Sequence, residues 1–152
     1  MDSLTKQLKE MESYFPLIDK KKESVSKTTI AWQIDHSLRV VNSVCKAMEI
    51  SNESDFKPQF KILKTFFLTV KWFPRGKAKA PKVVKSEEII TLEDLERRIG
   101  YAKSNLLKIK ELEKNAHFSH PYFGHLNLNE STRFLQTHTN HHLKIIRDII
   151  RK

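Results

Sequence analysis

Glycine is almost absent from this chain, and this scarcity restricts the folds open to it. Only three glycines occur among 152 residues, at Gly76, Gly100 and Gly124, and they lie far apart. Phosphate-binding loops and dinucleotide fingerprints need closely spaced glycines, so both are excluded. Leucine, isoleucine, lysine and glutamate are abundant, and these residues favour helices. We therefore expect an all-α fold, and the length indicates a single domain over residues 1–152.

Apolar residues recur at helical spacing between prolines and polar turns. The spacing predicts helices over Ser3–Phe15, Thr28–Ile50, Phe60–Trp72, Thr91–Lys114, and from Asn127 to the C-terminus. Pro58 is expected among the first helical residues of the third segment. Loops are predicted at Pro74–Ile90 and Ala116–Leu126. Four principal helices with a short extra helix and a long connecting loop predict an antiparallel four-helix bundle.

Two of the predicted helices begin with residues that suit a capping box. Thr91 is followed three residues later by Asp94, and Asn127 is followed at the same spacing by Glu130. In such a pair, the first side chain accepts a hydrogen bond from the backbone of the second residue, and the second returns one. We expect these residues to fix where the last two long helices begin.

The single cysteine and the lengths of the apolar segments exclude several classes of protein and indicate a cellular location. Cys45 is the single cysteine, so a disulfide scaffold and cysteine-based zinc motifs are excluded, and Cys45 is expected as a small core residue. The strongest apolar run, Phe66–Phe73, is short and contains Lys71, which is far from the length of a membrane span. Met1–Phe15 lacks the apolar stretch of a signal peptide. We expect a cytoplasmic protein with no membrane partner.

Histidines carry the strongest chemical signal. Six of the seven lie after residue 116, and His138 and His142 are spaced i and i+4 on a face shared with apolar residues of the last helix. Two imidazoles at this spacing can bind one metal ion. His36 is the only histidine of the second helix and would supply a third ligand. The neighbouring Asp35 points elsewhere on that helix. The competing interpretation is that these are core histidines that bind no metal.

The sequence also offers candidates for the residues around the three histidines. Trp32, Tyr122, Phe123 and His141 are candidates to line a pocket or to support the ligands, and His141 is expected to be the more exposed because it falls at the edge of the face. Each ligand's second ring nitrogen needs an orienting acceptor. Four residues could provide one, with no choice between them: Gln33, Ser43, Glu130 and Asn140. His117 and His120 are expected to be loop residues.

Three segments resemble the DinB/YfiT-like superfamily, and in particular a subgroup of uncharacterised DinB-like proteins. They are Trp32–Leu38, His120–Leu126, which reads HPYFGHL, and His138–Leu143, which reads HTNHHL. The resemblance extends from about Trp32 to Ile149. It implies an up-down-down-up four-helix bundle, often dimeric, and a divalent metal, commonly nickel or zinc, on His36, His138 and His142.

The same resemblance suggests an activity. Characterised relatives include transferases that use low-molecular-weight thiols of bacteria, such as bacillithiol or mycothiol, and an isomerase. We therefore expect a metal-dependent thiol transferase or hydrolase acting on a small molecule. Many relatives lack histidines where His125 and His141 stand, so extra ligands or a shifted pair of His138 with His141 stay open here. A metal-binding or structural bundle without catalysis is the alternative.

A basic stretch supports a different class of function. Residues 57–85 hold nine lysines or arginines and no acidic residue, with Phe66, Phe67, Trp72 and Phe73 interleaved. Such a composition can serve phosphate contacts and base stacking. Aromatic residues in a helix-length segment are more often core, however, and lysines more often form a solvated face. With no recognisable nucleic-acid motif, we do not expect nucleic acid to be the partner.

Overall fold

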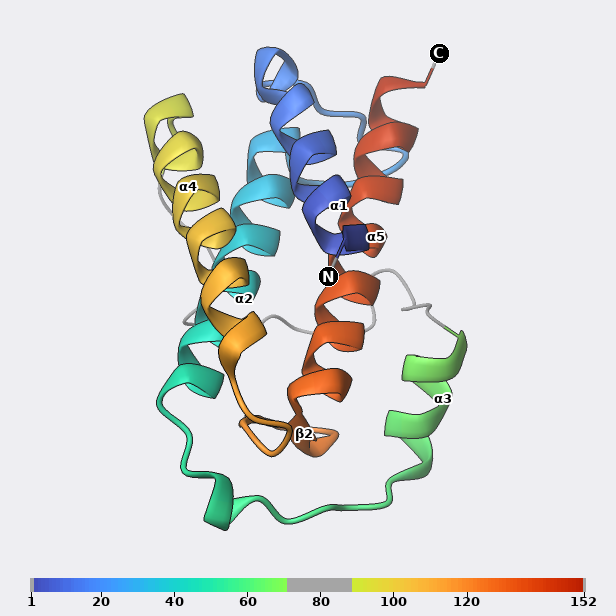
Figure 1. Cartoon of the computed structure of the whole chain (residues 1–152). Helices are drawn as coiled ribbons and strands as arrows, with labels where there is room; N and C mark the ends of the chain where they lie inside the picture. The colour runs from blue at the N-terminus through green and yellow to red at the C-terminus, as the bar shows by residue number, and fades with distance from the viewer. Residues whose placement is uncertain (1, 71–88, 152) are drawn as a thin grey trace.

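The computed structural model describes residues 2–70 and 89–151. Within these ranges the chain is mainly helical, with one small antiparallel sheet (Figure 1), and this confirms the expected all-α class. The helices are α1 (Asp2–Ser13), α2 (Ile30–Glu49), α3 (Ile62–Val70), α4 (Leu92–Lys108) and α5 (Leu128–Ile150). The strands are β1 (His117–His120) and β2 (Gly124–Asn127), and short 3-10 turns are η1 (Phe15–Leu17), η2 (Glu53–Asp55) and η4 (Ile109–Glu111).

The core lies between α1, α2, α4 and α5 (Figure 1). α2 contacts both α4 and α5, and α1 contacts the same two helices. The predicted apolar face of the first helix is confirmed, because Leu4, Leu8 and Met11 are all buried. Burial of each such side chain stabilises the fold by roughly 1.5–3 kcal/mol. α1 is therefore held by these contacts against α4 and α5.

Side-chain caps determine where three of these helices begin. The Thr29 hydroxyl accepts a hydrogen bond from the backbone N–H of Trp32 and starts α2. Thr91 and Asp94 form a complete capping box at α4, and Asn127 and Glu130 form another at α5. Both predicted capping pairs are confirmed. Because a cap satisfies backbone donors that the helix itself cannot, these residues fix where α2, α4 and α5 begin, and α2 and α5 carry the three histidines.

The predicted loop at Ala116–Leu126 is wrong, because most of it forms a β-hairpin. His117 pairs with Asn127 and His120 pairs with Gly124 in an antiparallel register. Gly124 has a positive φ of 71°, which L side chains rarely adopt, and a Cβ there would also collide with the side chain of Gln59. Four-residue strands are too short to give a clear period-2 pattern, so the proline and glycine dominated the sequence interpretation.

Two helix boundaries also differ from the prediction. α3 begins at Ile62, so Pro58 is not helical. The backbone N–H of Lys57 donates to Nδ1 of His125 at 3.3 Å, and this contact holds the preceding chain against the hairpin. α4 ends at Lys108 rather than Lys114, and η4 follows it directly. Tightening into a 3-10 turn is a common way for a helix to end.

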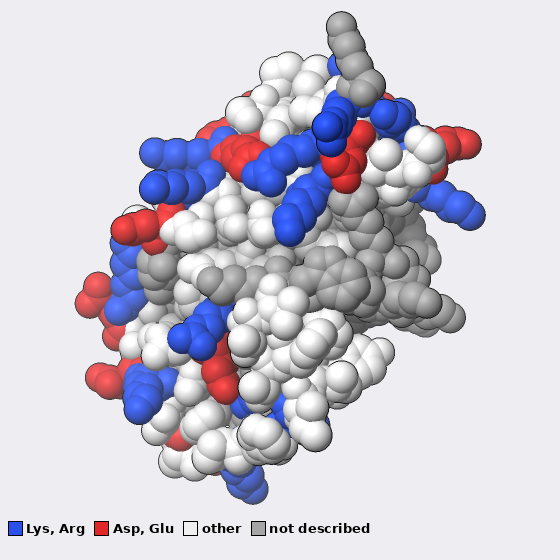
Figure 2. All heavy atoms as spheres, turned by 90° about the vertical axis from the view of Figure 1, so that its right-hand side faces the viewer, with Lys and Arg blue, Asp and Glu red and all other residues white. Residues whose placement is uncertain are grey.

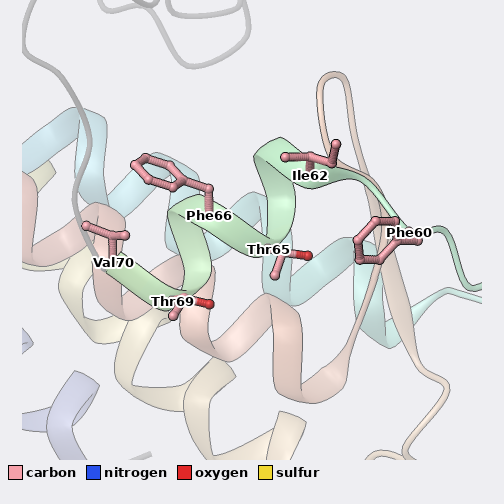
Figure 3. A pocket seen from close by; sticks show the side chains of 6 residues that line it. All are labelled: Phe60, Ile62, Thr65, Phe66, Thr69 and Val70. Atoms are coloured by element: carbon pink, nitrogen blue, oxygen red, sulfur yellow. The ribbon is translucent and has the colours of Figure 1, made fainter.

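α3 presents much of its apolar surface to solvent. Ile62, Leu63, Phe66 and Val70 are each at least half exposed, whereas Leu68 is buried. On the side of the molecule that carries α3, Figure 2 shows a stretch of surface with few charged side chains. An open pocket runs along this helix (Figure 3), lined by Phe60, Ile62, Thr65, Phe66, Thr69 and Val70.

Part of the sequence prediction lies outside the described residues. This applies to the loop at Pro74–Ile90 except Ile89 and Ile90, to Trp72 and Phe73, and to the basic residues from Lys71 to Lys85. In the two described ranges, no helix has the length and apolar character needed to cross a membrane.

Candidate metal centre

The structure brings His36, His138 and His142 together. Each offers a ring nitrogen, and these three atoms lie within 4.8 Å of one another. The ring centroids are 5.2 Å apart for His36 and His138, 4.9 Å for His36 and His142, and 4.6 Å for His138 and His142. His36 and His142 are buried and His138 is partly buried. The convergence that spacing alone could not establish is therefore present.

Packing of α2 against α5 produces this convergence. Leu135, Ile145, Ile146 and Ile149 are buried on α5, so the face that also carries His138 and His142 is turned inward. One residue after His36, the Ser37 hydroxyl donates to the Thr139 hydroxyl at 3.4 Å across the same interface. The two helices are thus joined by apolar contacts and by a polar contact at the level of the histidines.

A chain of hydrogen bonds supports His142. Its Nδ1 lies 2.6 Å from Oε1 of Gln33, one of the four candidate acceptors that the sequence left unranked. The Gln33 amide nitrogen in turn donates to the Thr28 hydroxyl at 2.7 Å and the Ser26 hydroxyl at 3.2 Å. Gln33 and His36 are spaced i and i+3 and therefore share a face of α2, which is the one sequence signal that favours Gln33.

Trp32 packs directly on the histidine cluster. Its ring stacks on that of His36 with centroids 5.0 Å apart and planes 8° from parallel. It also lies 6.4 Å from His142 in a tilted arrangement. Trp32 therefore lies beside His36 and His142. A large rigid ring on one side of His36 restricts the rotation of that imidazole.

The other predicted pocket residues lie farther from the three histidines or at their edge. Phe123 is buried and stacks on His120 at 4.3 Å. Tyr122 is 63% exposed, and its ring contact is with His120 at 6.0 Å. His141 meets His142 edge-on at 5.2 Å and is more exposed than His142, as expected. The cluster that could hold an ion contains neither His125 nor His141.

Burial keeps two of the predicted ligands, His138 and His142, neutral. It lowers the pKa of His138 well below that of an ordinary histidine, and the nearby His36 lowers it further. Burial also lowers the pKa of His142, with a further contribution from His138. A metal binds the neutral imidazole, since a protonated ring has no free lone pair. His138 and His142 therefore present the metal-binding form at neutral pH.

Carboxylates are absent from this cluster of described residues. Asp35 is buried beside His36 in sequence, but its carboxylate is held by Arg39 at 2.6 Å and Arg98 at 2.7 Å. The expectation that Asp35 points away from the site is confirmed. It serves instead to join α2 to α4 through Arg98. The donor set is therefore three neutral imidazoles, a combination that suits zinc, copper, iron and nickel.

Cys45 and the histidines of the hairpin lie outside the three-histidine cluster and make packing and hydrogen-bond contacts. Cys45 is buried, and burial raises the pKa of its thiol to about 12, as expected of a core cysteine. His117 and His125 stack at 4.7 Å, and both belong to the hairpin rather than to a loop. Nδ1 of His120 accepts from the backbone N–H groups of Tyr122 and Phe123 and stabilises the hairpin turn. His117, His120 and His125 therefore belong to the hairpin that joins α4 to α5.

The geometry permits a metal centre with an open position. Neighbouring nitrogens in a tetrahedral zinc site are about 3.3 Å apart, given zinc–nitrogen bonds near 2 Å. Three nitrogens already within 4.8 Å need only a small closure to reach that spacing. Three protein ligands leave room for a water or a substrate in the fourth position.

Comparison with known proteins finds no family model, no curated protein and no solved structure that matches this chain.

Proposed function

We propose that this protein binds a divalent transition-metal ion on His36, His138 and His142 and uses it to catalyse a reaction of a small molecule. The approach of three imidazole nitrogens to within 4.8 Å, from two separate helices, carries the proposal. Their burial and the lowered pKa values of His138 and His142 support it, because both favour the neutral form that binds metals.

The proposed chemistry follows from the donor set. A divalent ion on three imidazoles acidifies a water or binds a thiolate at its open position. We therefore propose a thiol-dependent transferase or a hydrolase, with nickel or zinc as the ion and a low-molecular-weight thiol or another small molecule as substrate. Trp32 would form one wall beside the reacting molecule, since it covers His36. Binding of the metal without catalysis is the alternative outcome.

The resemblance to the DinB/YfiT-like superfamily supports the same proposal. We propose that α1, α2, α4 and α5 form its up-down-down-up four-helix bundle and that two chains associate as a homodimer. The contacts of α2 with α4 and α5, and of α1 with the same helices, are compatible with that arrangement. The three histidines lie on α2 and α5, and this is compatible with the metal site that the resemblance implies.

Elemental analysis of protein purified without chelators tests the metal. We expect near-stoichiometric nickel or zinc in the wild type and none in a His138→Ala/His142→Ala variant. His117→Ala/His125→Ala is the matched control, because it removes a second histidine pair, in the hairpin, and should retain the ion. Absence of metal from the wild type after dialysis against zinc and nickel at pH 7.5 would contradict the proposal, as would retention by the first variant.

A second arm separates catalysis from simple binding. Metal-loaded and metal-free wild type are compared for transfer of bacillithiol or mycothiol to an electrophile and for hydrolysis of activated esters. We expect turnover only in the loaded wild type and not in His138→Ala/His142→Ala. A fully loaded protein that is inactive in all of these assays would favour the metal-binding alternative.

A further inference from the structure

The buried amide of Gln33 stands between the metal site and the chain that precedes α2. We propose that Gln33 is a positioning residue that fixes which ring nitrogen of His142 faces the metal. This inference rests on the proposed metal-binding function. It concerns a residue that is only 2% exposed, so its amide is not hydrogen-bonded to bulk water and must find its partners inside the protein.

The surroundings of the amide determine its orientation. Its nitrogen donates to Thr28 Oγ1 and Ser26 Oγ. Ser26 Oγ also accepts from the backbone N–H of Thr28 at 3.2 Å, and the two hydroxyls are 3.0 Å apart. Both hydroxyl oxygens therefore lie where they accept hydrogen bonds from the amide nitrogen. The amide oxygen is left facing Nδ1 of His142 at 2.6 Å.

That orientation selects one tautomer of the imidazole. A neutral imidazole carries a single N–H, and Gln33 Oε1 can only accept a hydrogen bond. The proton of His142 must therefore sit on Nδ1, and Nε2 keeps the lone pair that a metal requires. The opposite tautomer would place two lone pairs against each other at 2.6 Å and turn an N–H toward the ion. Gln33 makes the productive tautomer the favoured one before any metal arrives.

The group that accepts the hydrogen bond from His142 is a neutral amide rather than a carboxylate, and this affects the charge at the metal site. Supporting acceptors for metal-bound histidines are often carboxylates, which add negative charge and make the imidazole a stronger base. Here the nearby buried carboxylate, Asp35, is committed to Arg39 and Arg98. A neutral acceptor leaves the charge of the ion undiminished. Gln33 should therefore hold the ligand in place while preserving the ability of the metal to polarise a bound substrate.

Long-range proton–nitrogen NMR spectra of the metal-free protein at pH 7.5 test the tautomer directly. We expect His142 to be the Nδ1–H tautomer in the wild type and in Gln33→Glu, which keeps an acceptor at this place. Gln33→Met removes the acceptor at similar volume and should shift His142 toward the Nε2–H tautomer. A wild-type Nε2–H tautomer, or a Gln33→Met spectrum identical to the wild type, would overturn the inference.

Competitive zinc titration supplies the second readout. We expect Gln33→Met to weaken zinc binding by about 10–100-fold and Gln33→Glu to restore it, as is typical for loss of a supporting acceptor. Gln7→Met is the matched control, because Gln7 also donates an amide hydrogen bond between two helices, to the Gln136 carbonyl at 3.1 Å, and Gln7 lies on α1, which carries none of the three proposed ligands. It should bind zinc like the wild type.

The two proposals fail in distinguishable ways. A wild type with the Nδ1–H tautomer that binds no zinc would contradict the proposed metal function while the role of Gln33 in selecting the tautomer holds. A wild type that binds zinc, together with Gln33→Met binding it equally well, would overturn the positioning role alone.

Discussion

The interface of α2 with α5 and the helix α3 differ in which side chains they bury. The interface buries polar groups, among them Gln33, Ser37 and His142, and gives them hydrogen-bond partners. α3 leaves Ile62 and Phe66 facing solvent (Figure 3). The apolar content of a segment therefore does not predict how deeply its side chains are buried in this protein.

The number of packing neighbours explains the difference. α2 contacts α4, α5 and β1, so almost every side of it meets protein. Polar side chains there must be paired, because an unpaired buried polar group costs about 1–3 kcal/mol. α3 packs on α5 with one face, Leu68 is buried and Lys64 forms an ion pair with Glu130, whereas the apolar residues of its outer face stay at least half exposed. The comparison predicts unequal responses to matched substitutions.

The largest difference is expected between two leucines. Leu143 on α5 is 0% exposed and Leu63 on α3 is 57% exposed. Leu143→Ala should lower the free energy of unfolding by about 2–5 kcal/mol, because it leaves a cavity in the core. Leu63→Ala should change it by no more than about 0.5 kcal/mol. Urea unfolding at pH 7.5 measures both. Equal losses would break the comparison and mean that the outer face of α3 is covered in the folded protein.

The tightly packed region was also the more predictable one. The caps at Thr91 and Asn127 are local, so the beginnings of α4 and α5 could be predicted from a few residues. The spacing of His138 and His142 gave their common face, and the inward direction followed from their apolar neighbours. Gln33 could not be singled out, because its contact with His142 joins residues 109 positions apart in sequence. The i, i+3 spacing of Gln33 and His36 shows only that they share a face of α2, and it does not show that Gln33 meets His142.

The prediction for the aromatic segment was partly wrong. Phe67 is partly buried and packs on Phe123 at 5.8 Å, but Phe66 faces solvent and Phe60 is still more exposed. Lys64 was expected on a solvated face and is buried against Glu130 instead. In a nine-residue helix that packs on one side only, the buried face depends on which neighbour it meets. Composition does not contain that information.

Acid should weaken the region that contains the buried histidines. Burial lowers the pKa of His120 to about 4, and it lowers those of His138 and His142 as well. Because these values lie below the unfolded value of about 6.5, the unfolded chain binds more protons. Their contribution to stability is complete above about pH 6.5 and decreases as the pH falls below it, and for His120 it is lost as the pH falls toward about 4. Urea midpoints between pH 7.5 and 4.5 should decrease accordingly.

A His120→Gln variant isolates one part of this effect. Glutamine can still accept a hydrogen bond at the hairpin turn but does not titrate. Its midpoint should fall less than that of the wild type over the same pH range, while carboxylates shared by both proteins contribute equally. Parallel pH profiles for the two proteins would show that His120 is protonated as easily in the folded protein as in the unfolded chain.

The smallest effect on overall stability, and the sharpest test of how α3 is attached, comes from Lys64→Met. Lys64 is 8% exposed and lies 2.8 Å from Glu130, which also accepts from the Asn127 backbone. Lys103 and Glu12 form an ion pair of the same length, with both side chains more than 40% exposed. Lys103→Met should therefore change the free energy of unfolding by less than about 0.5 kcal/mol. Lys64→Met should lower it by about 1 kcal/mol, since methionine keeps most of the packing and the partly exposed Glu130 retains its capping contact.

Hydrogen exchange measures where Lys64→Met acts. Exchange should quicken at the backbone amides of α3 and stay unchanged at those of α2 and α5. Equal acceleration in α5 would mean that α3 and the site-bearing helix open as one unit.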